Sequence, residues 1–149
     1  MRNIRSKVSP GVAALAALLV APAWLASPAL AAEPTGLWQT ASRGGQVEIY
    51  RCGAALCGRL VSSEGLKADP NLKDTANSNA AQRGRALRNL TIMSGFSGGP
   101  KEWSGGSIYN AEDGKTYSGS ITLDGDDTLK LRGCVVAPLC KTQTWTRLR

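Results

Sequence analysis

The chain has 149 residues, a formal net charge of +7 and no histidine. Without imidazole, catalytic triads and histidine-dependent metal sites are excluded, and so is the usual general base near neutral pH. Aromatic residues make up only 5% of the chain and the basic residues are scattered, which argues against a nucleic-acid-binding surface. No catalytic constellation stands out, so we expect a non-enzymatic protein without a cofactor or a metal site.

Residues 1–31 have the three parts of a secretory signal peptide. Three basic residues precede a long apolar run, and the small residues Ala29 and Ala31 follow it. This pattern predicts cleavage before Ala32, with cleavage one residue later as the alternative. A single domain over 32–149 remains, with 15 positive and 11 negative residues and a charge of +4. We therefore expect a periplasmic or secreted protein.

From Gly36 onward, turn residues separate short runs of alternating polarity, which is typical of antiparallel β-structure. The pattern predicts eight strands, over 37–40, 47–52, 57–62, 87–96, 102–109, 116–123, 128–134 and 140–147. The sixth run shows the alternation best, because Tyr117, Ile121 and Leu123 share one face with Gly119. In the seventh run Leu129 and Leu131 face inward in the same way.

Nearly all of these strands are joined by loops of hairpin length, with Asp-Gly pairs where tight turns need residues that tolerate positive φ. Eight short antiparallel strands bury an apolar face by closing into a barrel. The sequence therefore predicts an all-β fold, a small eight-stranded antiparallel up-and-down barrel, with a sandwich as the alternative. The long connection over 63–85 has no strand period.

Four cysteines form two close pairs, Cys52 with Cys57 and Cys134 with Cys140, and each pair flanks a turn between two strands. An even number of cysteines in an exported chain indicates disulfides. Partners that face each other across a hairpin reach disulfide distance without distortion. We expect two local disulfides, although four cysteines allow three connectivities. A four-thiolate zinc site is the alternative, which an oxidising compartment disfavours.

The irregular connection over 63–85 is the expected rim of a ligand site, since long loops in compact domains are often functional. Arg83 and Arg85 lie in it and Arg88 follows closely, so the three guanidinium groups can hold a carboxylate or phosphate. A solvated basic loop is the alternative. Three aromatic side chains either line the barrel interior as ligand contacts or fill its core: Trp103, Tyr109 and Tyr117.

Seven motifs follow one another in a recognisable order: Gly36-Leu37-Trp38, then residues 47–53, 56–60, 103–110, 112–119, 129–133 and 143–147. Together they resemble an exported bacterial family, domain of unknown function 2147, over residues 36–147. The resemblance implies a lipocalin-like (calycin) β-barrel and no particular reaction. The chain departs from the family between Asp74 and Arg88, where Asn77-Ser78 and Arg85-Ala86 stand in place of Asn-Pro and Arg-Pro.

In a lipocalin-like barrel, a Gly-x-Trp of the first strand packs beneath an arginine of the last strand and plugs one end. Trp38 and Arg147 are placed for such a structural plug through a cation–π contact, unless they are unrelated residues. The resemblance also implies a small ligand in the barrel, apolar or anionic and amphipathic. The alternative is a protein-interaction module, an inhibitor or an envelope accessory factor, that uses the loops of a filled barrel.

Overall fold

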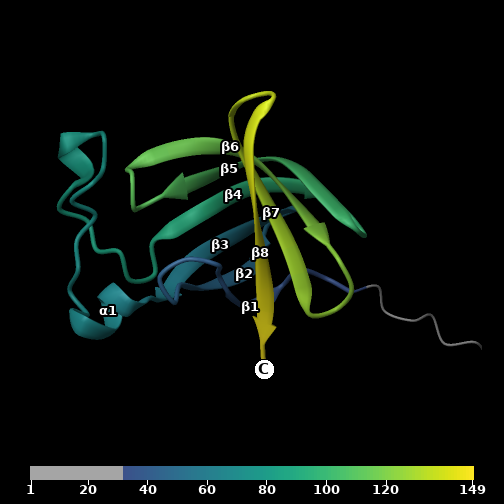
Figure 1. The fold of residues 1–149 in the computed structure, drawn as a ribbon, viewed down its shortest axis with the longest axis horizontal. Coiled ribbons are helices and arrows are strands. Elements are labelled where there is room, and N and C mark those ends of the chain that lie inside the picture. Colours follow the sequence, from purple (N-terminus) through teal and green to yellow (C-terminus); the bar gives the residue numbers. More distant parts are fainter. Residues whose placement is uncertain (1–31) are drawn as a thin grey trace, which may run out of the picture.

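Eight antiparallel strands close into a barrel in the order of the chain (Figure 1). They are β1 (Gly36–Gln39), β2 (Gln46–Cys52), β3 (Ala55–Ser62), β4 (Thr91–Gly98), β5 (Glu102–Asn110), β6 (Lys115–Leu123), β7 (Thr128–Val136) and β8 (Leu139–Leu148). Pairing of β1 with β8, Trp38 opposite Arg147, completes the closure. The structure is a computed structural model that describes residues 32–149, and the predicted signal peptide lies outside them. The predicted barrel is confirmed and the sandwich is wrong.

Two strands begin more than one residue away from the start that the polarity pattern predicts. β3 begins at Ala55, two residues early, because a turn of only two residues joins it to β2 and Cys52 pairs with Ala55. β4 begins at Thr91 and not at residue 87, because the backbone there still belongs to the preceding connection. In that connection the Leu87 amide donates to the Leu72 carbonyl at 3.0 Å.

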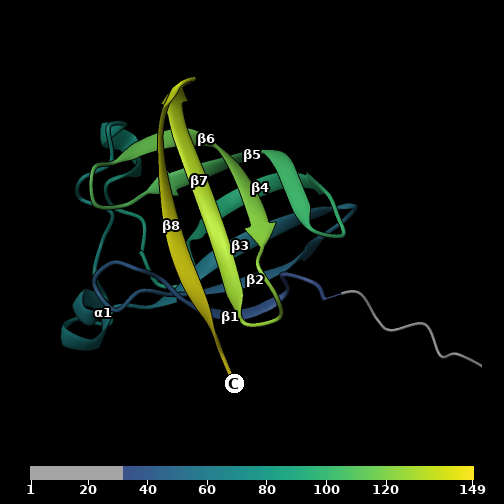
Figure 2. The same cartoon turned by 45° about the vertical axis from the view of Figure 1, so that its right-hand side comes forward.

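The connection from β3 to β4, here the β3–β4 segment (residues 63–90), contains two short helices that the sequence did not predict. α1 (Glu64–Ala68) begins at Ser63, whose hydroxyl accepts from the Leu66 amide at 3.1 Å and caps the first turn. Leu66 is fully buried, and the Glu64 amide donates to the Arg43 carbonyl of the β1–β2 loop at 3.0 Å, which ties the helix to the barrel. A 3₁₀ turn (Ala80–Gln82) follows. Figures 1 and 2 show this segment standing outside the ring of strands.

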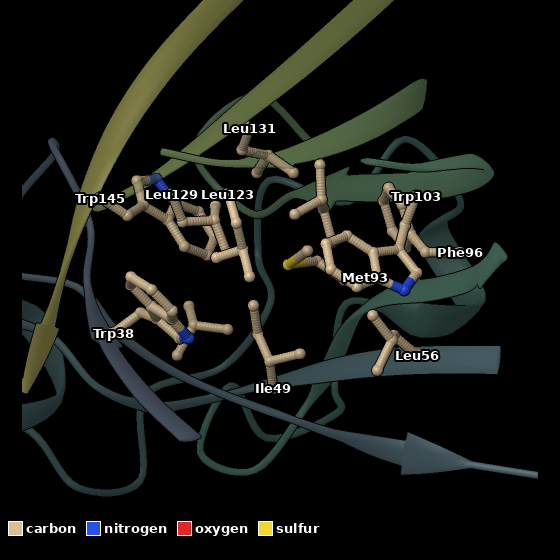
Figure 3. Close-up of a cluster of buried hydrophobic side chains, with 12 residues drawn as sticks. Trp38, Ile49, Leu56, Met93, Phe96, Trp103, Leu123, Leu129, Leu131 and Trp145 are labelled. Atoms are coloured by element: carbon tan, nitrogen blue, oxygen red, sulfur yellow. The ribbon is translucent and has the colours of Figure 1, made fainter. Parts of the chain in front are cut away.

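Inward-facing side chains pack together in a cluster inside the barrel (Figure 3). The core cluster contains Trp38, Val47, Ile49, Leu56, Met93, Phe96, Trp103, Ile121, Leu123, Leu129, Leu131 and Trp145. Ile121, Leu123, Leu129 and Leu131 confirm the predicted alternation of β6 and β7. Two inward-facing glycines make room for this packing. A Cβ at Gly106 would lie 2.4 Å from the Phe96 ring, and one at Gly119 would lie 2.5 Å from Ile108.

Both predicted disulfides are present, Cys52–Cys57 and Cys134–Cys140, and no described cysteine is free. The second pair lies directly opposite in the β7–β8 register, with Cα atoms 4.0 Å apart. The first pair was expected to be opposite as well, and that expectation is wrong. Cys57 pairs with Tyr50, so this disulfide runs diagonally across the hairpin between Cα atoms 5.8 Å apart.

Trp38 and Arg147 lie together at the filled end of the barrel. The guanidinium carbon of Arg147 is 4.2 Å from the centre of the Trp38 ring, and the indole nitrogen donates to the Pro34 carbonyl at 2.7 Å. Arg147 also donates to three backbone carbonyls, those of Glu33, Thr35 and Asp126. The arginine thereby ties the start of the domain and the β6–β7 turn to the last strand.

Candidate functional site

The two ends of the barrel differ in what covers them. Four connections gather at one end, which we call the open end: the β1–β2 loop, the β3–β4 segment, the β5–β6 turn and the β7–β8 hairpin. All four contribute to the lining of a single broad cavity of about 980 Å³. That volume lies at the upper limit of those usual for small-molecule sites. The opposite end is occupied by the core and by the Trp38–Arg147 pair.

The floor of the cavity is apolar because the inward face of the strands continues upward from the core. It is formed by Val47, Leu60, Ile92, Ile108, Leu131 and Trp145. The indole nitrogen of Trp145 donates to the side-chain oxygen of Gln143 at 3.0 Å. This bond satisfies the one polar atom of the largest floor residue and positions the Gln143 amide along the cavity wall.

The rim of the cavity is charged. Its ionisable residues are Arg43, Glu64, Lys73, Glu112, Asp113 and Lys141. Glu112 is engaged by Arg43 at 3.6 Å and by the Ser42 hydroxyl at 2.7 Å. Lys73 and Lys141 form no ion pair with any residue of 32–149. Two ammonium groups therefore remain available to a ligand at the mouth.

Tyr117 and Asp113 form a polar pair on the cavity wall, in which the phenol donates to the carboxylate at 2.5 Å. That hydrogen bond is the main reason why the pKa of Tyr117 lies above its usual value. Burial alone raises the pKa of Asp113, but the bonds from Tyr117 and from the Lys115 amide outweigh it and lower the pKa. The pair keeps a neutral phenol and an ionised carboxylate beside the apolar floor.

Asp74 fastens the β3–β4 segment to the barrel. Its carboxylate is 1% exposed and accepts from Asn77 at 2.8 Å, Arg85 at 2.8 Å and Tyr109 of β5 at 2.6 Å. Burial by itself raises the pKa of Asp74, yet these three bonds and the charge of Arg85 hold the pKa below its usual value. The buried charge is thus fully paired, as the interior of a protein requires.

The three arginines expected to bind a ligand have partners within the segment itself. Arg83 donates to the Asn77 carbonyl at 2.8 Å, and Arg88 approaches the Leu66 carbonyl at 3.5 Å. Arg85 pairs with Asp74 and lies 4.8 Å from the centre of the Tyr109 ring. None of the three lines the large cavity. That the three arginines bind one anion together stays a prediction. In the structure their guanidinium groups have three different partners.

The three candidate aromatic residues separate into two groups. Tyr109 and Tyr117 line the cavity. Trp103 is 2% exposed and belongs to the core near the filled end, where its indole nitrogen has no hydrogen-bond partner among the described residues. Trp103 therefore fills the barrel and the two tyrosines border the open space.

Three polar residues of the cavity lining are not predicted from the sequence: Lys73, Lys141 and Gln143. Alternation along β8 is the signal that finds two of them, since Lys141, Gln143 and Trp145 share one face. Lys73 and Asp74 lie in an irregular segment, where no period predicts which side chain faces the barrel. Among residues 32–149 no group of three or more acidic or cysteine side chains is arranged to hold a metal ion.

A closed eight-stranded antiparallel barrel, filled at one end and hollow at the other, defines a lipocalin-like protein. Over residues 36–147 the chain belongs to the family described as "Uncharacterized protein conserved in bacteria (DUF2147)". The predicted membership is thereby confirmed. No helix within residues 32–149 has the length and apolar character needed to span a membrane.

One solved structure shares the fold closely. It is protein HP1028 from the human pathogen Helicobacter pylori, described as belonging to the lipocalin family. The two chains superpose with a TM-score of 0.71 at 25% sequence identity, over 79% of this chain and 84% of the other. A comparison with curated proteins gave no match. The disulfides and the bacterial family indicate a protein of a compartment outside the cytoplasm.

Proposed function

We propose that the protein is an exported, non-enzymatic carrier of a small amphipathic ligand with an anionic head. The single observation that carries this proposal is the cavity of about 980 Å³ with its apolar floor and its charged mouth. The apolar body of the ligand packs on Leu131 and Trp145 and its head lies near Lys141 and Lys73. The likeness to a lipocalin supports binding rather than catalysis.

The rival function, a protein-interaction module, predicts a barrel filled by its own side chains. The hollow half at the open end supports the carrier instead. A domain that only presents loops would be more stable if core side chains filled this space. Export is part of the proposal: residues 1–31 act as a cleaved signal and the single domain over 32–149 is released. Intact-mass measurement of protein isolated from the periplasm tests this, with a chain beginning at Ala32 as the expected result.

The first experiment on function is native mass spectrometry of that periplasmic protein, followed by denaturing extraction. We expect one bound small molecule per chain, with an apolar body and an acidic group. A bare polypeptide from freshly isolated material, together with failure of the probe titration below, contradicts the proposal.

The probe titration uses anilinonaphthalene sulfonate, which is apolar and anionic. Gly133→Leu places an apolar side chain in the cavity, where a Cβ meets only Ile108 at 3.5 Å and Tyr117 at 3.7 Å. We expect it to weaken binding of the probe at least about ten-fold, because the leucine occupies space above the apolar floor and the probe then buries less of its own apolar surface. Thr122→Leu, on the exposed outer face of β6, is the matched control and should bind as the unmodified chain does.

A further inference from the structure

Every large apolar side chain that is exposed within residues 32–149 belongs to one turn. Val135 is 72% exposed, Val136 is 61% and Leu139 is 67%. With Ala137 and Pro138 they form the hairpin tip (residues 135–139), an uninterrupted apolar stretch at the end of β7 and β8. Exposed apolar clusters of this kind mark an interaction site.

The hairpin tip is held in place and stands clear of the barrel. The disulfide Cys134–Cys140 closes its base, and Val136 pairs with Leu139 above it. Figures 1 and 2 both show the β7–β8 hairpin projecting beyond the neighbouring strands. The apolar side chains are therefore presented in a defined arrangement, and little conformational entropy is lost when they are covered.

Two cationic residues flank the base of the hairpin tip. Arg132 and Lys141 are both exposed and lie on opposite faces of the hairpin, since Lys141 pairs with Gly133. Neither forms an ion pair within the described part of the chain. No aspartate or glutamate occurs between residues 128 and 149. At the same barrel end Glu112 is paired with Arg43 and Asp113 accepts from the Tyr117 phenol, while Glu64 forms no ion pair within residues 32–149.

We propose that the hairpin tip inserts into the interface of a lipid bilayer that carries anionic headgroups. An apolar end with a cationic collar matches the layering of such a surface, where acyl chains lie beneath negative phosphates. The apolar side chains occupy both faces of a narrow turn, which suits immersion better than docking on a flat protein surface. Because Gly133 and Lys141 also line the cavity, insertion brings the cavity mouth beside the membrane.

The test is co-sedimentation of the exported chain, isolated from the periplasm, with vesicles of phosphatidylcholine containing phosphatidylglycerol. We expect binding at low salt, and much weaker binding to phosphatidylcholine alone. Arg132→Gln with Lys141→Gln should lower the affinity about 25-fold, or about five-fold for each cation removed. Lys67→Gln with Lys101→Gln removes the same charge from exposed sites elsewhere and should change the affinity far less.

Insertion itself is tested by Val136→Trp, whose emission should shift to the blue and be quenched by brominated acyl chains. The unmodified chain is the control, because Trp38, Trp103 and Trp145 are buried. Replacing Val135, Val136 and Leu139 together by serine should abolish binding while leaving the melting temperature unchanged. Failure to bind anionic vesicles, equal losses in both charge variants, or a dimer that the serine variant dissociates would each overturn the proposal. None of these outcomes depends on a ligand in the cavity.

Discussion

At the scale of single residues, Asp74 shows how one buried charge organises an irregular segment. Three donors from different parts of the chain converge on its carboxylate, and two of them, Asn77 and Arg85, lie within the β3–β4 segment itself. The third, Tyr109, belongs to β5. Backbone hydrogen bonds from Asn89 to Leu60 and from Ser78 to Gly114 also join the segment to the barrel, but Asp74 supplies its buried charged contact.

We therefore expect Asp74→Asn to destabilise the protein by about 2–3 kcal/mol, because it leaves buried donors poorly paired and removes a charge-assisted bond. Urea unfolding measures the change. Asp69→Asn, an exposed carboxylate of the same segment that accepts from the Asn71 amide, should cost much less. Equal stability of the two variants would contradict the role assigned to Asp74.

The same residue predicts a pH dependence. The folded-state pKa of Asp74 lies below its usual value of 3.8, so the unfolded chain takes up the proton first as the pH falls. The stability that Asp74 contributes is complete above about pH 4 and is lost as the pH falls through the folded-state pKa. Unfolding free energies measured across this range should decline for the unmodified chain and decline less for Asp74→Asn. Identical slopes would argue against the lowered pKa.

At the scale of elements, the inner face of the barrel depends on glycines as much as on large side chains. Gly106 on β5 and Gly119 on β6 lie opposite each other in the register. Phe96 and Ile108 occupy the space above them. Large and small residues therefore interlock across three neighbouring strands, which lets the sheet close tightly around its core.

Gly106→Ala should cost about 1–3 kcal/mol by overpacking, since its Cβ would lie 2.4 Å from the Phe96 ring. In a Phe96→Leu background the same substitution should cost less, and a double-mutant cycle measures the coupling. Gly84→Ala is the control, because nothing lies within 4 Å of a Cβ there. If Gly106→Ala and Phe96→Leu have additive effects on the free energy of unfolding, the proposed contact is ruled out.

The part of the β7–β8 hairpin that extends past the barrel is held together by the Cys134–Cys140 disulfide. Closing such a short loop stabilises the folded chain by about 2 kcal/mol in the chain-entropy model. Cys134→Ser with Cys140→Ser should lower the free energy of unfolding by about that amount and loosen the hairpin tip. Thiol titration of the denatured unmodified chain should find no free cysteine; two or more free thiols would refute the pairing.

At the scale of the whole molecule, the barrel consists of a filled half and a hollow half. The filled half holds the Trp38–Arg147 pair and the core cluster, whereas the hollow half ends in four connections around the cavity. This division separates the packed core from the residues around the cavity. The filled half keeps the strands in register, and the charged and irregular connections all lie around the mouth.

Hydrogen exchange should reveal this division directly. Amides of β2, β3 and β6 in the filled half should open only in global unfolding, and those of the β3–β4 segment and the hairpin tip should exchange through local opening. Mass spectrometry of peptic fragments measures the difference. Uniform protection from one barrel end to the other would contradict the two-part description.

The sequence by itself determined the β-class, the strand count, the two disulfides and the family, because strand period, turn residues and cysteine spacing are local properties. Alternation also placed Ile121 and Leu129 correctly in the core. It failed over 63–90, where α1 and the 3₁₀ turn are too short to show a helical period and the burial of Asp74 depends on Tyr109 of distant β5.

Only the tertiary structure decided which barrel end is filled. That choice depends on Phe96, Trp103 and Trp145 from different strands meeting inside one half, a property of volume that no local pattern contains. The tertiary structure also decided that Arg85 forms an ion pair with Asp74, and that Lys141 lies beside both the cavity and the hairpin tip. Closure of the barrel fixes these neighbours, since it brings β1 and β8 together across more than a hundred residues of chain.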